Sequence, residues 1–271
     1  MGAATTTAAP SRAAGPHPVL RVLDYFLLLM RRTFRGAIFT SFLSPLLYLV
    51  AMGYGLGSLV DRGGTQSLGG VSYLQFIAPG MLVATAMQGG VFDASYPVLG
   101  AIKWQRQFHA MLATPIGVRD VVLGNLAAIA LRMVLPAVVF LAVAALLGAV
   151  LSWWSLLALP VVVLVTLAYA GPMFALAARS ETDSAFSIVF RVALVPMFLF
   201  SGTFFPVDQL PGWLQPAAYI VPLWHASELA RHATLGRLEP GAELLHVGYL
   251  LLWVGVGAWL AVRTLRRRMV V

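Results

Sequence analysis

The stretch LLALPVVVLVTLAYAGPMFALAA, residues 156–178, contains no charged side chain in 23 positions. As an α-helix rising 1.5 Å per residue it would be about 35 Å long, which is enough to cross a hydrocarbon core of about 30 Å. A helix of this length in a soluble protein would need a polar face toward water. The stretch therefore predicts a transmembrane helix.

Five further apolar windows predict that the chain is an all-α, polytopic membrane protein with six transmembrane helices. The predicted spans cover about 38–59, 73–99, 121–151, 156–178, 184–204 and 244–263. The fifth contains Arg191, and the sixth contains His246 and has no Asp, Glu, Lys or Arg before Arg263 at its end. Before the first span, the apolar segment Val19–Met30 is interrupted by Arg21 and Asp24, which is typical of an amphipathic helix on the membrane surface.

The overall composition agrees with a membrane protein. The 271 residues are 60% hydrophobic and 10% charged, whereas about a quarter of the residues in soluble chains are charged. This excludes a disordered chain and argues against a cytosolic enzyme. The net charge of +8 comes from basic residues scattered between apolar runs, so nucleic-acid binding is not expected. Without cysteine there is no thiolate metal site, and the polar helix face of His225, Glu228 and His232 matches no known zinc signature.

Basic residues also predict the orientation of the chain. Most of the 18 Lys and Arg residues lie in the segments assigned to the side that holds both termini. By the positive-inside rule, we expect a multi-pass protein of the plasma (inner) membrane with both termini cytoplasmic. Residues 1–17 are small, polar and proline-containing, and predict a disordered cytoplasmic tail before one transmembrane domain at 18–271.

Two connections between the spans have distinctive patterns. After the second span, KWQRQFHAMLATPIGVR (103–119) repeats large apolar residues at helical spacing, which predicts a short amphipathic helix over 103–115. Such a helix either rests on the membrane surface or docks a cytoplasmic partner. In the outer segment 202–224, prolines recur among apolar and aromatic residues, so we expect broken, re-entrant segments covered by the rest of the protein.

Three charges lie within or beside the predicted spans: Asp93, Arg132 and Arg191. Ionisable groups at membrane depth generally face the protein interior, water or each other. Asp93 is expected to pair with Arg132 or Arg191 across helices, with snorkelling to the interface and contact with substrate as the alternatives.

Four ordered motifs resemble the ABC-2-type transporter permeases, in particular the branch with nodulation lipo-oligosaccharide and daunorubicin-type exporters. The motifs are FLSPLLYLVAMGYGLG (42–57), FIAPGMLVATAM (76–87), MLATPIGVRDVVLGN (111–125) and FSGTFFPVDQLPGWLQ (200–215), the last continuing into VPLWHASELAR (221–231). The resemblance covers about 20–265. It implies an ABC-2 (type V) exporter-like fold in which two permease copies, or a permease and a paralogue, pack together above two ATPase subunits.

The resemblance also implies roles for residues at matching positions. The helix at 103–115 would be a coupling helix that contacts the ATPase, and an outer gate would lie before the sixth span. Gly53, Gly55 and Gly57 permit close helix approach in the first span, which the resemblance places at the dimer interface. The residues expected at the ATPase contact are Trp104, Arg106, Phe108, Leu112, Thr114 and Pro115, and those expected at the outer gate are Phe204, Pro206, Trp213, His225, Glu228 and Arg231.

The energy source can be addressed from the residues alone. A P-loop needs Gly-Lys followed by Ser or Thr, but the only lysine, Lys103, lies between Ile102 and Trp104. If transport is driven by ATP, as the resemblance implies, ATP and Mg²⁺ must bind a partner subunit, with no cofactor in this chain. The function that the resemblance implies is export of an amphiphilic, glycolipid, polysaccharide or drug-like substrate from the cytoplasm or inner leaflet. The alternative is an intramembrane enzyme acting on lipids or lipid-linked sugars around His225.

Overall fold

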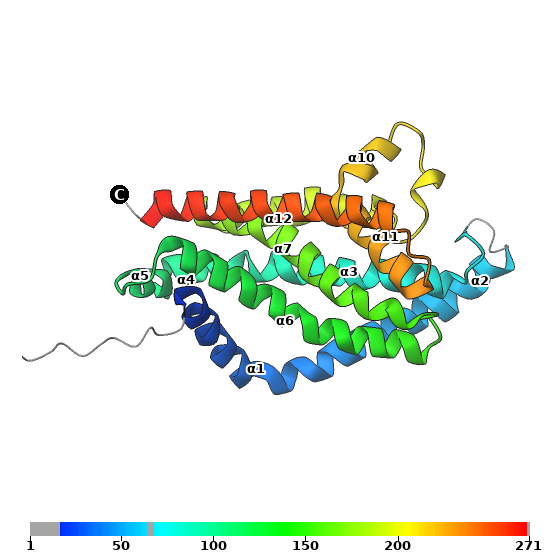
Figure 1. Cartoon of the computed structure of the whole chain (residues 1–271), viewed down its shortest axis with the longest axis horizontal. Coiled ribbons are helices and arrows are strands. Elements are labelled where there is room, and N and C mark those ends of the chain that lie inside the picture. Colours follow the sequence, from blue (N-terminus) through cyan, green and yellow to red (C-terminus); the bar gives the residue numbers. More distant parts are fainter. Residues whose placement is uncertain (1–16, 64–67, 270–271) are drawn as a thin grey trace, which may run out of the picture.

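The computed structural model describes residues 17–63 and 68–269, and within these ranges the chain is helical and contains no β-strand. The long helices α3 (Tyr73–Asp93), α6 (Val118–Leu146), α7 (Ala158–Arg179) and α12 (Pro240–Met269) lie side by side along the long axis (Figure 1). Helix α1 (Pro18–Leu49) bends and packs along α6. The described segments begin and finish at the same end of the bundle, here called the terminal end, and the opposite end is called the distal end. The all-α prediction is confirmed for the described residues.

Shorter helices flank and connect the long ones. They are η1 (Val50–Leu56), α2 (Gly57–Arg62), α4 (Tyr96–Lys103), α5 (Gln107–Leu112), η3 (Trp153–Leu157), α8 (Ser184–Ile188), η4 (Val189–Leu194), α9 (Val195–Phe200), η5 (Val207–Gln209), α10 (Gln215–Ile220) and α11 (Pro222–Leu235). The π-helical turns η1 and η4 continue the α-helices around them without a break. The predicted surface helix and first span are thus joined in one helix, from α1 through α2.

Four segments of the described chain are long and apolar enough to cross a bilayer: 73–103, 118–146, 153–179 and 240–269. They contain the second, fourth and sixth predicted spans. The third was predicted over 121–151, but its helix α6 ends at Leu146, so that span is shorter than predicted. The fifth corresponds to the apolar helix Ser184–Phe200, which at about 26 Å is shorter than the hydrocarbon core. The first predicted span, 38–59, is described only in part, because the side chains of residues 31–45 lie outside the described part of the structure. The tail before residue 17 also lies outside it. The total of six spans therefore stays a prediction.

Helix α7 is the centre of the bundle, where it packs against α3, α6, α11 and α12. Small residues allow these helices to approach closely. A Cβ atom on Gly257 of α12 would lie 2.6 Å from Cδ of Pro172 on α7, and one on Gly90 of α3 would lie 2.8 Å from Cγ2 of Thr166. The bundle core therefore depends on backbone contacts as well as on large apolar side chains.

The segment 201–221 lies on the side of the bundle, toward the distal end, and forms only the short helices η5 and α10 (Figure 1). Its prolines interrupt any longer helix, because each lacks a backbone N–H and clashes with the preceding turn. Val207, Leu210 and Ala218 form a small apolar cluster separate from the main core. The broken backbone agrees with the sequence pattern, and its re-entrant position in a membrane stays a prediction.

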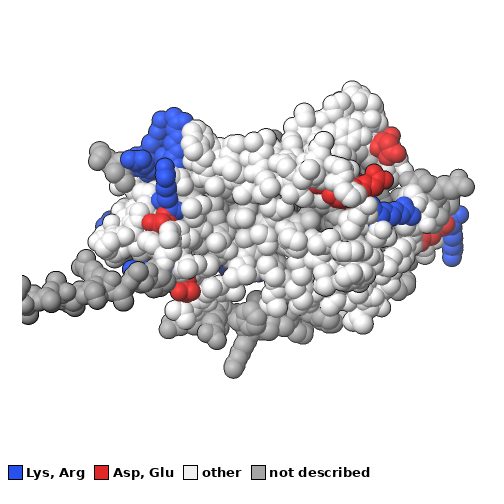
Figure 2. Space-filling view, in the orientation of Figure 1, with Lys and Arg blue, Asp and Glu red and all other residues white. Residues whose placement is uncertain are grey.

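The charged side chains are unevenly distributed over the surface. Figure 2 shows Lys and Arg gathered where α12 ends and further charges toward the distal end, with a broad uncharged band between them. Ionised groups are costly inside a bilayer, so such a band fits the membrane-spanning part of the molecule.

Candidate functional site

The connection from α4 to α6 forms a turn at the terminal end of the bundle, here called the α4–α6 turn (residues 103–117). The pattern predicts one helix over 103–115, but α4 ends at Lys103 and the six-residue α5 begins only at Gln107. Between them, Arg106 has a φ of +51°, in the left-handed region that interrupts a helix. The predicted single coupling helix is therefore wrong in its extent.

The residues predicted to contact an ATPase separate into exposed and buried positions. Trp104 is 68% exposed, and Arg106, Thr114 and Pro115 are also exposed, whereas Leu112 is half-buried. Phe108 is fully buried and stacks on Phe174 of α7, with ring centroids 6.0 Å apart. We correct its expected role: Phe108 attaches the turn to the bundle core and is not available to a docked partner.

A network of ion pairs joins three segments beside this turn. Lys103 lies 3.5 Å from the carboxylate of Glu181, which follows α7, and Arg268 of α12 lies 3.1 Å from the same carboxylate. Arg268 also donates to the carbonyl oxygens of Ala178 and Ser180, at 3.1 and 2.8 Å. No local pattern in the sequence signals these contacts, because Glu181 lies 78 positions from Lys103 and 87 positions from Arg268.

Of the three charges expected at membrane depth, two form a pair. Asp93, at the end of α3, lies 3.4 Å from Nη1 of Arg132 on α6. Arg191 in η4 is exposed and has no ion pair with any described residue. Of the two pairings left open by the sequence, the structure contains the one with Arg132.

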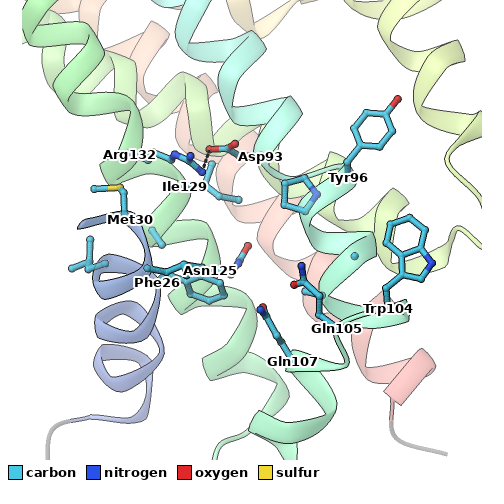
Figure 3. A pocket seen from close by; sticks show the side chains of 16 residues that line it. Phe26, Met30, Asp93, Tyr96, Trp104, Gln105, Gln107, Asn125, Ile129 and Arg132 are labelled. Carbon is cyan, nitrogen blue, oxygen red and sulfur yellow. Dashed lines mark ion pairs between the residues drawn. The ribbon is translucent and has the colours of Figure 1, made fainter. Parts of the chain in front are cut away.

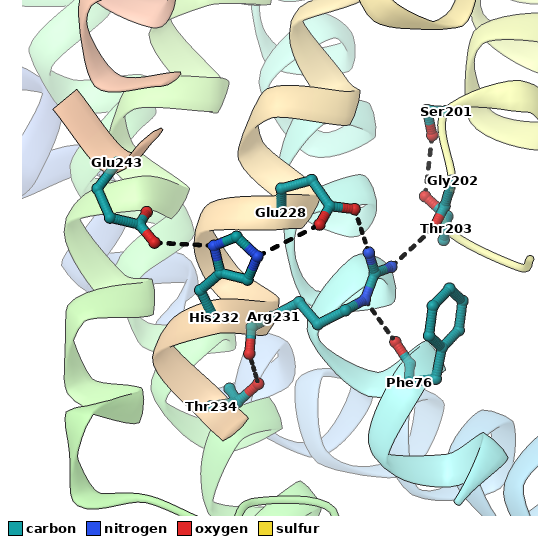
Figure 4. Close-up of polar contacts among 9 residues, drawn as sticks. All are labelled: Phe76, Ser201, Gly202, Thr203, Glu228, Arg231, His232, Thr234 and Glu243. Carbon is teal, nitrogen blue, oxygen red and sulfur yellow. Dashed lines mark hydrogen bonds and ion pairs between the residues drawn. The ribbon is translucent and has the colours of Figure 1, made fainter. Parts of the chain in front are cut away.

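A second polar cluster surrounds Arg231 of α11 (Figure 4). The guanidinium donates to the carbonyl oxygen of Gly202 at 2.7 Å and to that of Phe76 at 3.5 Å, and it forms an ion pair with Glu228. It also lies over the Phe76 ring, 3.9 Å from the centroid. Gly202 adopts a φ of +74°, which a side chain would disfavour. Arg231 therefore ties the broken outer segment to α3 and α11.

Two histidines extend this cluster to α12. His232 contacts Glu243 at 2.8 Å and Glu228 at 3.6 Å. The ring of His225 stacks on Tyr249, and its Nε2 lies 3.0 Å from the carbonyl oxygen of Tyr219.

The carbonyl can only accept, so Nε2 of His225 carries the proton and Nδ1 accepts from Nδ1 of His246 at 2.7 Å. Burial, with His246 beside it, lowers the pKa of His225 to about 4. Both ring nitrogens are thus engaged within the chain. Because neither is free to act as a base, this arrangement does not favour the enzyme alternative.

Of the other residues predicted at the outer gate, Pro206 lines the same pocket as Glu228 and Arg231, whereas Phe204 and Trp213 do not line it. Phe204 packs edge-on against Phe198 with ring centroids 4.8 Å apart, Pro206 is half-buried, and Trp213 is 79% exposed. Sequence reasoning missed Phe76, Glu243 and His246, which reach the cluster from α3 and α12. The signal for this cluster in the sequence was the motif of His225, Glu228 and Arg231, which the family resemblance placed at the outer gate.

The glycines expected at a dimer interface pack mainly inside this chain. A Cβ atom on Gly53 would lie 2.3 Å from Cδ1 of Leu74, and one on Gly57 would lie 3.7 Å from Tyr73, both on α3. Gly55 is exposed and has no described atom within 4 Å of such a Cβ. The expected role of Gly53 and Gly57 is corrected to close packing within the chain, and only Gly55 is left facing outward.

These features define a multi-helix membrane protein with polar clusters near both ends of an apolar bundle. The chain belongs to the ABC-2 type transporter family, whose model matches residues 19–235. Nodulation protein J of Rhizobium leguminosarum bv. trifolii is 38% identical over 83% of this chain and 84% of its own, and that of Rhizobium meliloti (strain 1021) is 37% identical over the same shares. The inner membrane transport permease YadH of Escherichia coli (strain K12) is 24% identical over 70% of this chain and 72% of its own.

Proposed function

We propose that this chain is the membrane-spanning permease subunit of an ABC exporter whose ATP is hydrolysed by a separate subunit. The family membership and the relationship to YadH, named as an inner membrane transport permease, support the transport role. The observation that carries the partner proposal is the α4–α6 turn. Trp104 and Arg106 stand exposed there, and large aromatic and arginine side chains are common anchors of protein interfaces.

The same turn offers a route by which a partner could move the bundle. Phe108 joins the turn to α7 through its contact with Phe174, and α7 in turn packs against the long helices α3, α6 and α12. A docked ATPase that pushed on the turn would therefore act on the centre of the bundle. Alternating access additionally requires that the two permease conformations differ in their affinity for the ATPase states.

The remaining assignments follow from this proposal. The terminal end would face the cytoplasm, where the ATPase binds ATP and Mg²⁺, and the Arg231 cluster would hold the outer segment that closes the path. A second permease copy, identical or paralogous, would complete the path. An amphiphilic or glycolipid-like cargo suits walls that are mostly apolar, and the plasma (inner) membrane is the expected location.

Copurification tests the ATPase partner. A tagged permease is expressed with a candidate P-loop ATPase, and the amount of ATPase recovered and its hydrolysis rate in lipid are measured. Trp104→Ala should reduce the recovered ATPase about tenfold, because loss of an interface anchor commonly costs more than 1 kcal/mol. Trp213→Ala is the matched control, since Trp213 is also exposed but lies in the outer segment.

Two results would contradict the proposal. Equal ATPase recovery by both tryptophan variants would remove the α4–α6 turn as the docking site. Turnover of a lipid or lipid-linked sugar by the isolated permease, without any ATPase, would favour an intramembrane enzyme.

A further inference from the structure

A pocket of about 460 Å³ lies between α1, the α3–α4 junction, the α4–α6 turn and α6 (Figure 3). Its wall combines two kinds of surface. Phe26 and Met30 of α1, with Ile129 of α6, are apolar, whereas Asp93, Asn125 and Arg132 are polar or charged. A space lined in this way suits a molecule with an apolar part and a polar part.

Two buried acceptor atoms in this wall lack hydrogen-bond donors among the described residues. Asn125 is only 7% exposed, and its Oδ1 atom has no hydrogen-bond partner. Oδ2 of Asp93 is likewise without a hydrogen bond, and Nη1 of Arg132 lies 3.4 Å from it. In Figure 3, Asp93, Asn125 and Arg132 lie around the same space, facing the apolar residues of α1. Unpaired buried acceptors are costly, so a ligand that donates hydrogen bonds would be stabilised here.

The charges of the wall restrict which ligand fits. Arg132 supplies one positive charge and Asp93 one negative charge, and Gln105 and Gln107 add neutral amides. A net anion would lie against Asp93 and a net cation against Arg132, so neither is favoured. A headgroup that has no net charge and carries N–H or O–H donors is compatible with both Asp93 and Arg132.

We propose that this pocket binds the headgroup of an amphiphile that has no net charge and carries N–H or O–H donors, while its acyl chain lies against Phe26 and Met30. A resident lipid with a primary ammonium group and a cargo with sugar hydroxyls share this chemistry. The proposal needs only the membrane setting. It is tested without ATPase activity, so its failure and a failure of the transport proposal can be told apart.

The test is native mass spectrometry of the purified full-length permease, with any subunit that copurifies, in a detergent without N–H or O–H groups. Dioleoyl phosphatidylethanolamine is compared with dioleoyl phosphatidylcholine, which has the same net charge but no N–H donor. We expect about fivefold more phosphatidylethanolamine to be retained, the effect of one net hydrogen bond. If added glucosyl diacylglycerol displaces it, sugar-bearing amphiphiles use the same site; if not, the site holds a resident lipid.

Substitutions in the pocket test whether the preference for phosphatidylethanolamine arises there. Asn125→Leu removes the buried acceptor with little change in size, and Asp93→Asn removes the negative charge. Both should reduce retention of phosphatidylethanolamine to the level of phosphatidylcholine. Gln88→Leu, at an exposed position of α3 outside the pocket, is the matched control and should keep the preference. Equal retention of the two lipids by the wild type, or a preference that survives Asn125→Leu, would overturn the proposal.

Discussion

Arg231 shows how much of the distal architecture depends on one side chain. It is buried, yet its guanidinium reaches the carbonyl oxygens of Gly202 and Phe76 and the carboxylate of Glu228. An arginine can do this because its planar fork presents five donors in fixed directions, whereas lysine carries a single ammonium group on a flexible stem. The stability of this cluster is therefore expected to depend on the geometry of the guanidinium group as well as on its charge.

We predict that Arg231→Lys lowers the free energy of unfolding by about 2–4 kcal/mol, because at least one carbonyl or carboxylate oxygen is left buried without its donor. Thermal unfolding of the purified protein in detergent measures the effect. Arg237→Lys is the control, because Arg237 is exposed and donates to the carbonyl oxygen of Gly69 at 3.1 Å. Equal melting temperatures for the two variants would contradict this role of Arg231.

Trp104 and Phe108 differ in exposure although they lie only four residues apart. Both belong to one apolar repeat in the sequence, and both were expected at the ATPase contact. The break at Arg106 turns the following helix so that Phe108 enters the core against Phe174, while Trp104 stays exposed. Periodicity identifies the apolar positions of a segment, but it does not say which neighbour they meet.

At the scale of helices, the central packing of α7 against α12 depends on glycine. Gly171 and Gly257 face each other: a Cβ atom on Gly171 would lie 2.7 Å from the backbone carbonyl carbon of Gly257. Backbone atoms cannot move aside as a flexible side chain can, so even one methyl group would force the helices apart.

Gly257→Ala is therefore predicted to lower the free energy of unfolding by about 1–3 kcal/mol, the usual cost of overpacking a core. Gly255→Ala, on the same helix, is the control, because the structure places no described atom within 4 Å of the added Cβ. Unfolding of both variants in detergent, followed by size-exclusion chromatography, gives the comparison. Alanine favours a helix more than glycine does, so Gly255→Ala should cause no loss. If it were as destabilising as Gly257→Ala, the close contact of Gly257 with Pro172 would not explain the effect.

At the scale of the whole molecule, the polar features are separated along the bundle. The α4–α6 turn and the Lys103–Glu181–Arg268 network lie toward the terminal end, and the Arg231 cluster lies toward the distal end (Figures 1 and 2). The four candidate spans connect the two ends through the uncharged band. This arrangement suits a protein that receives force on one side of a membrane and opens on the other.

Site-directed labelling tests the orientation. The chain contains no cysteine, so one introduced cysteine is its only thiol. We predict that Trp213→Cys reacts with a membrane-impermeant maleimide in intact cells, and that Thr114→Cys reacts only after permeabilisation. Both positions are exposed in the structure, and the cysteine-free parent measures background labelling. The reverse pattern would place the termini outside and contradict the positive-inside assignment.

The sequence by itself determined the helical membrane class, the family and most of the long spans. These properties follow from the length of the apolar windows and from ordered motifs, both of which can be read along the chain. The broken outer segment was also predictable, because proline acts on its own backbone whatever surrounds it.

Only the tertiary structure decided which residues meet. The pairing of Asp93 with Arg132, the burial of Phe108, the close packing of Gly53 against Leu74 and the contacts of Arg231 with Phe76 all join segments distant in sequence. Local propensities describe a segment and its faces, but contacts between segments depend on the rotation and crossing of packed helices. Those quantities exist only once the bundle has formed, and they separate the residues available to a partner from those that hold the fold.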